Sequence, residues 1–215
     1  MGVCRGQGVA FLCADFDQKY PSPRHHFHHQ FFGGVGYVGA ARMEVTSDVI
    51  IRPERLDDIP KIHDLTIAAF LNAEHTDHTE QFIVLRLREA GALTVSLVAA
   101  VDDAVVGHVA ISPVTVDGAD VGWFGLGPIS VDPSRQGAGI GSSLMDAALN
   151  ALRELGASGC VVLGDPAYYS RFGFRVHRGL EYPGVPAEYF QAISFDGDVP
   201  SGIVAYHDAF SATDS

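Results

Sequence analysis

The chain has 215 residues, of which 47% are hydrophobic, and its formal net charge at pH 7 is −12. This length suffices for one well-buried core or two small ones, and the acidic balance argues against nucleic acid, whose phosphates need a basic face. The three cysteines are too few and too scattered for a disulfide framework, and no apolar run approaches the ~20 residues of a membrane helix. We therefore expect a cytoplasmic protein that does not contact membranes.

The first 42 residues differ from the rest of the chain. They contain a histidine tract at His25–His29 and a glycine-rich stretch at Gly33–Gly39, without strand or helix periodicity. The histidines lack cysteine or carboxylate partners at useful spacing, so we expect no metal site. Residues 1–42 are predicted to be a disordered extension, and 43–215 a single domain with its natural start at Met43. A Met43–Ser215 chain should then be as stable and active as the whole.

The elements that follow are a strand, two helices and a run of strands. The first helix is capped by Asp57-Asp58, and the second places Phe82, Leu85 and Glu89 at helical spacing. The hydrophobic period then changes to two, with Asp117-Gly118 as a hairpin turn. The predicted ranges are 48–52, a helix ending at Phe70, a helix over 76–90, and strands over 95–101, 104–116 and 120–131.

A second helix-and-strand region completes the domain. A helix is expected from Gly139 to Leu155, with Gly156 as its C-cap. The later elements are a strand over 159–163, a short helix over 166–172, and strands over 174–177 and 203–206. Antiparallel strands in series after two helices do not begin a parallel doubly wound sheet, so the prediction is an α+β domain around a mixed sheet.

The segment Gln136-Gly137-Ala138-Gly139-Ile140-Gly141-Ser142 has the composition of a phosphate-binding turn. Its glycines let the backbone approach a bulky anion, and a helix N-terminus supplies unpaired N–H donors. A P-loop is excluded because no lysine follows the glycines, and Gly-x-Gly-x-Gly is not the dinucleotide spacing, although Asp165 lies where a ribose-binding acid could. A glycine-rich helix start without any ligand is the remaining alternative.

The same turn resembles the Gln/Arg-x-x-Gly-x-Gly/Ala signature of the GCN5-related N-acetyltransferases (GNAT). Leu126–Val131 and Leu163–Phe174 resemble the YhbS-like subgroup of that family. The resemblance implies a mostly antiparallel sheet, splayed between its fourth and fifth strands, with helices on both faces. Acetyl-CoA is then expected in the splay, its pyrophosphate on residues 136–142 and its pantetheine along Ile129, Ser130 and Val131.

Gly127-Pro128 fits this splay from its own chemistry. Proline cannot donate to a strand ladder and glycine favours a bulge, so strand pairing should end there.

For the acid and the base of the reaction, the sequence offers several candidates. Tyr169 matches the tyrosine of a Tyr-x-x-x-Gly-Phe segment that in this family often protonates the leaving thiolate, although Tyr168 and Tyr169 could both be core aromatics. The family's usual glutamate on the fourth strand has no counterpart in Trp123–Leu126. The base candidates are His108, Asp165, and Glu74 or His75, with a water chain as an alternative. Arg171 could contact CoA phosphates or lie on the surface.

We therefore expect an acetyl-CoA-dependent N-acetyltransferase that acts by direct attack on the thioester and needs no metal. The acceptor is an amine of a small molecule or a protein, and a homodimer is left open. Residues 70–80 and 179–195 should shape the acceptor pocket. The alternatives are a non-catalytic acyl-CoA-binding module and a dinucleotide-binding oxidoreductase.

Overall fold

The computed structural model describes residues 49–72, 76 and 78–211. The predictions about residues 1–42, the histidine tract and a start at Met43 lie outside these ranges. Within them, no helix combines the length and the apolar character needed to cross a bilayer.

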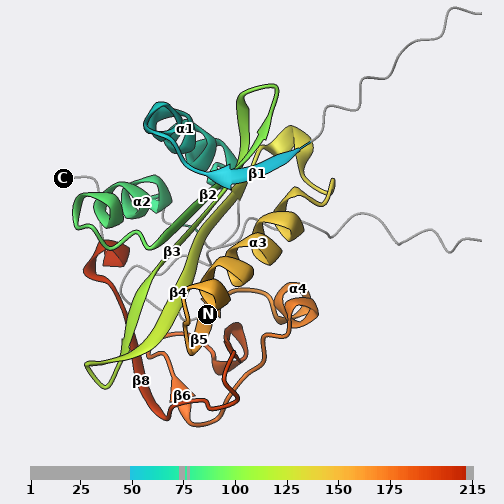
Figure 1. The fold of residues 1–215 in the computed structure, drawn as a ribbon. Coiled ribbons are helices and arrows are strands. Elements are labelled where there is room, and N and C mark those ends of the chain that lie inside the picture. The colour runs from blue at the N-terminus through green and yellow to red at the C-terminus, as the bar shows by residue number, and fades with distance from the viewer. Residues whose placement is uncertain (1–48, 73–75, 77, 212–215) are drawn as a thin grey trace, which may run out of the picture.

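A single eight-stranded sheet organises the described part of the chain (Figure 1). Its main path runs in the order β1-β2-β3-β4-β5-β7, and β8 pairs with the far end of β3 and with β6. Neighbours are antiparallel except for β4 with β5 and β6 with β8. The expected mixed, mostly antiparallel sheet is confirmed. The strands are β1 (Ile50–Pro53), β2 (Val95–Val101), β3 (Ala104–Val116), β4 (Ala119–Val131), β5 (Gly159–Leu163), β6 (Leu180–Glu181), β7 (Phe190–Ser194) and β8 (Gly202–Tyr206).

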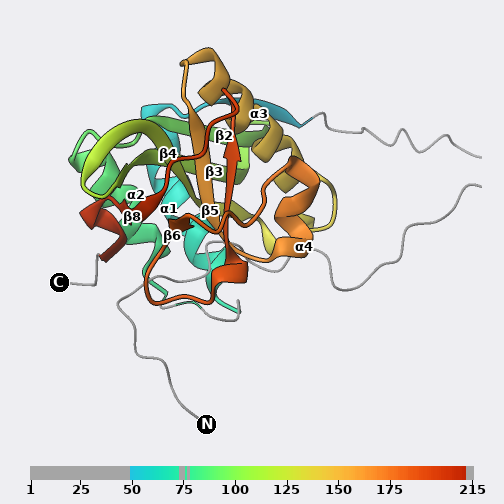
Figure 2. The ribbon, with the colours of Figure 1, turned by 90° about the horizontal axis from the view of Figure 1, so that it is seen from below.

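The long helices lie on both faces of this sheet. Helices α1 (Ile59–Phe70) and α2 (Glu80–Glu89) cover one face, and α3 (Ile140–Glu154) covers the other (Figure 1). The view in Figure 2 shows the same separation from below. A short helix, α4 (Pro166–Tyr169), follows β5.

Helix α2 differs from its prediction in its start and in its buried face. His78 has a φ of 58°, in the left-handed region that an α-helix excludes, so the helix begins at Glu80 and not at Thr76. The residues that pack inward are Ile83, Val84 and Leu87, whereas Leu85 is exposed.

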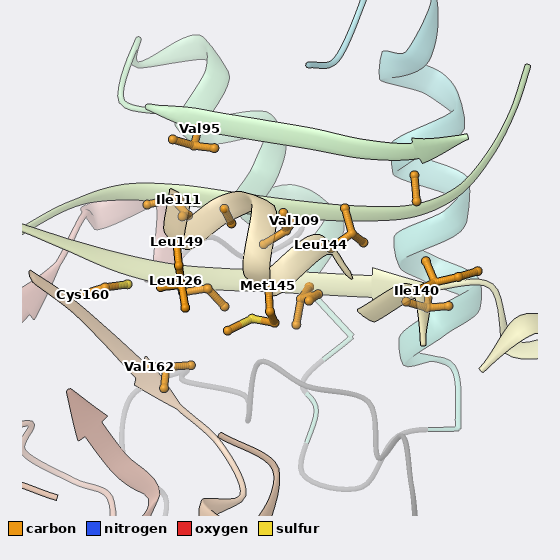
Figure 3. Packing of buried hydrophobic residues seen from close by; sticks show 14 of the residues in the cluster. Val95, Val109, Ile111, Leu126, Ile140, Leu144, Met145, Leu149, Cys160 and Val162 are labelled. Atoms are coloured by element: carbon orange, nitrogen blue, oxygen red, sulfur yellow. The ribbon is translucent and has the colours of Figure 1, made fainter. Parts of the chain in front are cut away.

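The largest core cluster lies between α3 and the sheet. Leu144, Met145 and Leu149 of α3 point at the strands, as Figure 3 shows. They meet apolar side chains from β2 to β5, and this contact fixes the N-terminal turn of α3 beside the end of β4. The strand residues labelled in that view are Val95, Val109, Ile111, Leu126, Cys160 and Val162.

The C-terminal third contains one wrong strand prediction and two strands, β6 and β7, that the predicted ranges lack. Residues 174–177 are not a strand, because only Arg175 forms an isolated bridge, to Ala192. Ala192 belongs to β7, which pairs along the whole of β5.

Candidate active site

The site begins where β4 and β5 separate. Their parallel pairing runs from Trp123 opposite Gly159 to Leu126 opposite Val162, and ends there. The next two residues of β4 are Gly127 and Pro128, where the β3–β4 register also shifts. The expected end of pairing at Gly127-Pro128 is therefore confirmed, and the sheet is split beyond Leu126.

The last residues of β4 direct backbone groups into this split. The amide of Asp132 donates to Val106 O on β3 at 2.9 Å, so the backbone groups of Val131 and Ile129 face the other way by strand alternation. Val131 O accordingly accepts a bond from Gln136 Nε2 at 3.3 Å on that side. The split thus presents main-chain donors and acceptors along Ile129–Val131, while the Ile129 and Val131 side chains lie in the core.

The glycine turn joins β4 to α3 with two left-handed residues. Gly137 and Gly139 have φ values of 77° and 83°, and a side chain built on either would meet no atom within 4 Å. Asp132 braces the start of the turn, because its carboxylate accepts bonds from the Ser134 amide and hydroxyl at 2.8 and 2.6 Å. The space above the turn is open, and the backbone can be approached closely there.

The first turn of α3 supplies amide donors. The first helical bond runs from Ser143 N to Gly139 O at 3.0 Å, so the amides of Ile140, Gly141 and Ser142 have no partner within the helix. Gln136 and Ala138 are the remaining members of the predicted set, and both lie in the turn itself. Together these residues form a small concave surface of N–H groups suited to an anion.

Two adjacent tyrosines close the site on the α4 side. The hydroxyl of Tyr168 is 3.0 Å from where a Cβ on Gly141 would lie, at the first turn of α3. Tyr169 is fully buried and packs on Gly164 and, edge to face, on Phe174. Arg171 stacks over the Tyr168 ring, 4.1 Å from its centroid.

His108 lies on the opposite face of the sheet in a buried polar network. Its Nε2 is 2.8 Å from the Ser96 hydroxyl, which donates to Glu54, and Glu54 pairs with Arg88. Burial lowers the pKa of His108 to about 4, and the nearby Glu54 offsets this only in part. The imidazole is therefore neutral at pH 7.

The other base candidates from the sequence lie elsewhere. Asp165 is exposed and caps α4, accepting from Ala167 N at 2.8 Å. Glu74 and His75 lie outside the described residues. Within the described ranges, no group of three or more His, Cys, Asp or Glu side chains is arranged to hold a metal ion.

Sequence reasoning missed three polar groups beneath α1 and α2. Glu80 is completely buried at the start of α2, and the hydroxyls of Ser112 and Tyr206 are buried without a hydrogen-bond partner in the described part of the chain. The only sequence signal was a carboxylate at the head of an amphipathic helix, which is usually read as a favourable N-terminal charge.

Comparison with known proteins agrees with this geometry. Residues 59–174 match the model of the acetyltransferase (GNAT) family. The uncharacterized N-acetyltransferase YhbS of Escherichia coli K12 is 39% identical over 171 residues, which span 76% of this chain and 99% of YhbS. A split mixed sheet with a glycine turn before α3 defines the acetyltransferase class, and the chain belongs to the GNAT family.

Two solved structures are similar over the same share of the chain. A GNAT family acetyltransferase from Brucella melitensis, in complex with acetyl-CoA, is 48% identical with a TM-score of 0.69, covering 76% of this chain and 99% of its own. YhbS from Escherichia coli, in complex with CoA, is 38% identical with a TM-score of 0.69 and is covered over 92% of its length. The fold and the enzyme class, an acyl-CoA-dependent acetyltransferase, follow from these matches.

Proposed function

We propose that this protein transfers the acetyl group of acetyl-CoA to an amine of a small molecule or a protein by direct attack on the thioester. The observation that carries the proposal is the conjunction of the split after Leu126 with the open glycine turn at the head of α3. The first offers strand-like partners for an amide-bearing arm, and the second offers amides for a pyrophosphate. The complexes of the two similar structures with acetyl-CoA and CoA support this assignment.

In this proposal acetyl-CoA, the acetyl donor, lies along β4. The pyrophosphate is bound by the backbone of Gln136, Gly137, Ala138 and Gly139, together with Ile140, Gly141 and Ser142. The pantetheine amides pair with the outward backbone groups of Ile129 and Val131, as a further strand would, with Ser130 between them. The thioester then lies near Gly127-Pro128, where β4 and β5 part.

The transfer of the acetyl group has three chemical requirements that the protein must meet. A backbone N–H near the split polarises the thioester carbonyl, the amine must be neutral to attack, and the departing thiolate must be protonated. Tyr169 is the proposed acid, since it follows β5 on α4 and its neighbour Tyr168 reaches the first turn of α3. His108 and Asp165 are weaker proposals for the base, because one is bonded to Ser96 and the other caps α4.

The proposal is tested by thiol release from acetyl-CoA with the full chain. The acceptor panel contains straight-chain amines, amino acids and lysine peptides, and CoA and NAD are titrated calorimetrically in parallel. We expect CoA binding, no NAD binding, and thiol release that depends on at least one amine. CoA binding without turnover on any acceptor would favour the non-catalytic module, and NAD binding without CoA binding would overturn the assignment.

A further inference from the structure

A line of buried polar side chains runs under α1 and α2, on the face of the sheet opposite α3. Such groups are costly in an apolar interior unless each has a partner. Some are paired: the Thr66 hydroxyl bonds Ile62 O, and His108 bonds Ser96. The members are Thr66 on α1, Glu80 on α2, His108 and Ser112 on β3, Ser130 on β4 and the Tyr206 hydroxyl on β8.

Among these buried groups, Glu80 is the carboxylate that lacks a hydrogen-bond partner for one of its oxygens within the described ranges. Its side chain is 0% exposed, and Oε1 accepts a bond from the Thr76 hydroxyl. Oε2 is buried and has no hydrogen-bond partner among the residues the structure describes. No arginine, lysine or histidine of those ranges forms an ion pair with it. A buried carboxylate oxygen without a partner points to a ligand that supplies one.

The course of α2 places Glu80 over β4. Near its end, Arg88 pairs with Glu54, which also bonds Ser96 on β2. One turn earlier, Val84 lies in one buried cluster with Val98 of β2 and Ala110 of β3. A further turn back is about 6 Å of helix, close to the ~4.8 Å spacing between strands, so Glu80 lies over the next strand. Contact between α2 and β4 agrees with this.

The Ser112 and Tyr206 hydroxyls lie at the same part of the sheet. The Tyr206 ring covers Gly125 so closely that a Cβ on that glycine would overlap it, and Ser112 is the cross-strand partner of Gly125. Tyr206 also packs on Phe210 and thereby joins the cluster that contains Ile83, which is on the same stripe of α2 as Glu80. Gly125 precedes Leu126, the last residue of β4 to pair with β5. Ser112 and Tyr206 therefore lie at the closed end of the split, and the contact of α2 with β4 brings the helix that carries Glu80 to the same strand.

We propose that Glu80 takes the proton from the acceptor amine, and that the hydroxyls of Ser112 and Tyr206 complete the polar end of the acceptor subsite. This inference rests on the proposed function, which puts the thioester at the same end of the split from the α3 side. Acceptor and donor then meet through the gap between β4 and β5. Burial raises the pKa of Tyr206 well above its usual value, so its hydroxyl stays protonated as a donor.

The proton balance of the step is as follows. The amine arrives as an ammonium ion and gives one proton to Glu80, and the neutral nitrogen attacks the carbonyl carbon. The C–N bond forms, the C–S bond breaks, and the second proton leaves nitrogen as the thiolate is protonated. Glu80 returns its proton to solvent, so each turnover yields the amide, free CoA thiol and one proton.

The side chains around Glu80 also indicate which class of acceptor the proposed subsite would bind. The Glu80 carboxylate attracts a cation, while the buried side chains of Ile83, on the same helix, and of Phe210 are apolar and favour a hydrocarbon chain. A primary amine at the end of an unbranched chain meets both conditions. Branched and secondary amines should react far more slowly.

The test compares two acceptors that differ in whether they need a base. Straight-chain alkylamines are cationic at pH 7, whereas methoxyamine is neutral and can attack without losing a proton first. For Glu80→Gln we expect thiol release with alkylamines to fall about 10²-fold and with methoxyamine by less than about tenfold. Glu89→Gln, on the same helix but exposed and paired with Arg86, is the matched control and should leave both rates unchanged.

Folding is checked by the unfolding midpoint and by the acetyl-CoA affinity of each variant. Glu80→Asp retains the carboxylate, so its ratio of alkylamine to methoxyamine rates should stay near the wild-type ratio even where both rates fall. Tyr206→Phe should raise the KM for alkylamines more than it lowers kcat. Equal losses with both acceptors, or wild-type rates in Glu80→Gln, would overturn the role of Glu80 and leave the proposed function standing. Absence of thiol release by the wild type with every amine would overturn both.

Discussion

At the scale of single residues, the site separates two tyrosines that the sequence places side by side. Tyr169 is enclosed between Gly164 and Phe174, whereas Tyr168 is half-buried with its hydroxyl at the first turn of α3. The proposed acid is therefore in a dry environment, and its neighbour is close to the amides proposed to bind pyrophosphate. Removal of the Tyr169 hydroxyl should therefore affect turnover, and removal of the Tyr168 hydroxyl should affect CoA affinity.

Tyr169→Phe should lower turnover by about 10²-fold with little change in CoA affinity, because only a proton donor is removed. Tyr168→Phe, the matched neighbour, should instead weaken CoA binding and leave the rate at saturation nearly unaltered. Steady-state kinetics and calorimetry on both variants measure this. An unchanged rate in Tyr169→Phe would remove that residue from the mechanism.

His108 should make stability depend on pH. Because burial lowers its pKa to about 4 in the folded protein, only the unfolded chain binds its proton as the pH falls below about 6.5. The free energy of unfolding should therefore decrease between pH 6.5 and 4.5 by about 2 kcal/mol from this group. The salt-bridged Asp58, whose pKa is lowered to about 2 chiefly by Arg52, titrates below that window.

Urea unfolding at several pH values measures the effect. In His108→Gln the decrease over this window should be much smaller than in the wild type. An equal decrease in both proteins would assign the pH dependence to other groups.

At the scale of elements, α3 positions the glycine turn through its packing on the sheet. Leu144 is fully buried, and both its side chain and that of Ile140 lie where a side chain on Gly107 of β3 would be. The absence of a side chain at Gly107 lets the first turn of α3 approach the sheet closely. The position of the turn is thus set by a contact between residues far apart in the sequence.

Leu144→Ala should reduce the free energy of unfolding by about 3 kcal/mol, since it opens a cavity under α3. Leu155→Ala removes the same atoms just past the end of that helix, where the side chain is 60% exposed, and should cost less than about 0.5 kcal/mol. Chemical denaturation compares them. Similar losses in the two variants would contradict the packing described for α3.

At the scale of the whole molecule, the sheet divides the face covered by α3, where we propose that acetyl-CoA binds, from the face covered by α1 and α2. Much of the proposed acetyl-CoA side can be predicted from the sequence. The strand alternation up to Val131, the proline at 128 and the glycine turn are all local patterns. The end of strand pairing at Gly127-Pro128 follows from the same local chemistry.

The other face depends on contacts that no local pattern encodes. Ser112 and Tyr206 come from strands separated by a long stretch of chain, and only the fold brings them together at Gly125, where we propose that Glu80 joins them. The start of α2 was misplaced because the left-handed backbone of His78 has no signature in its residue type. Residues 174–177 are predicted as a strand, but β7 pairs along the edge of β5 and leaves this segment a single bridge, from Arg175 to Ala192.

The measurement that most directly tests the central claim is calorimetric titration of acetyl-CoA into the wild type, Gly139→Asp and Gly156→Asp. Gly139 and Gly156 lie at opposite ends of α3, have φ values of 83° and 76°, and face open space, so the two substitutions carry the same backbone strain. Only the first puts a negative charge among the α3 amides. We predict an affinity loss of about a hundredfold or more for Gly139→Asp and near wild-type affinity for Gly156→Asp. Equal affinities in the three proteins would contradict a pyrophosphate site at this turn.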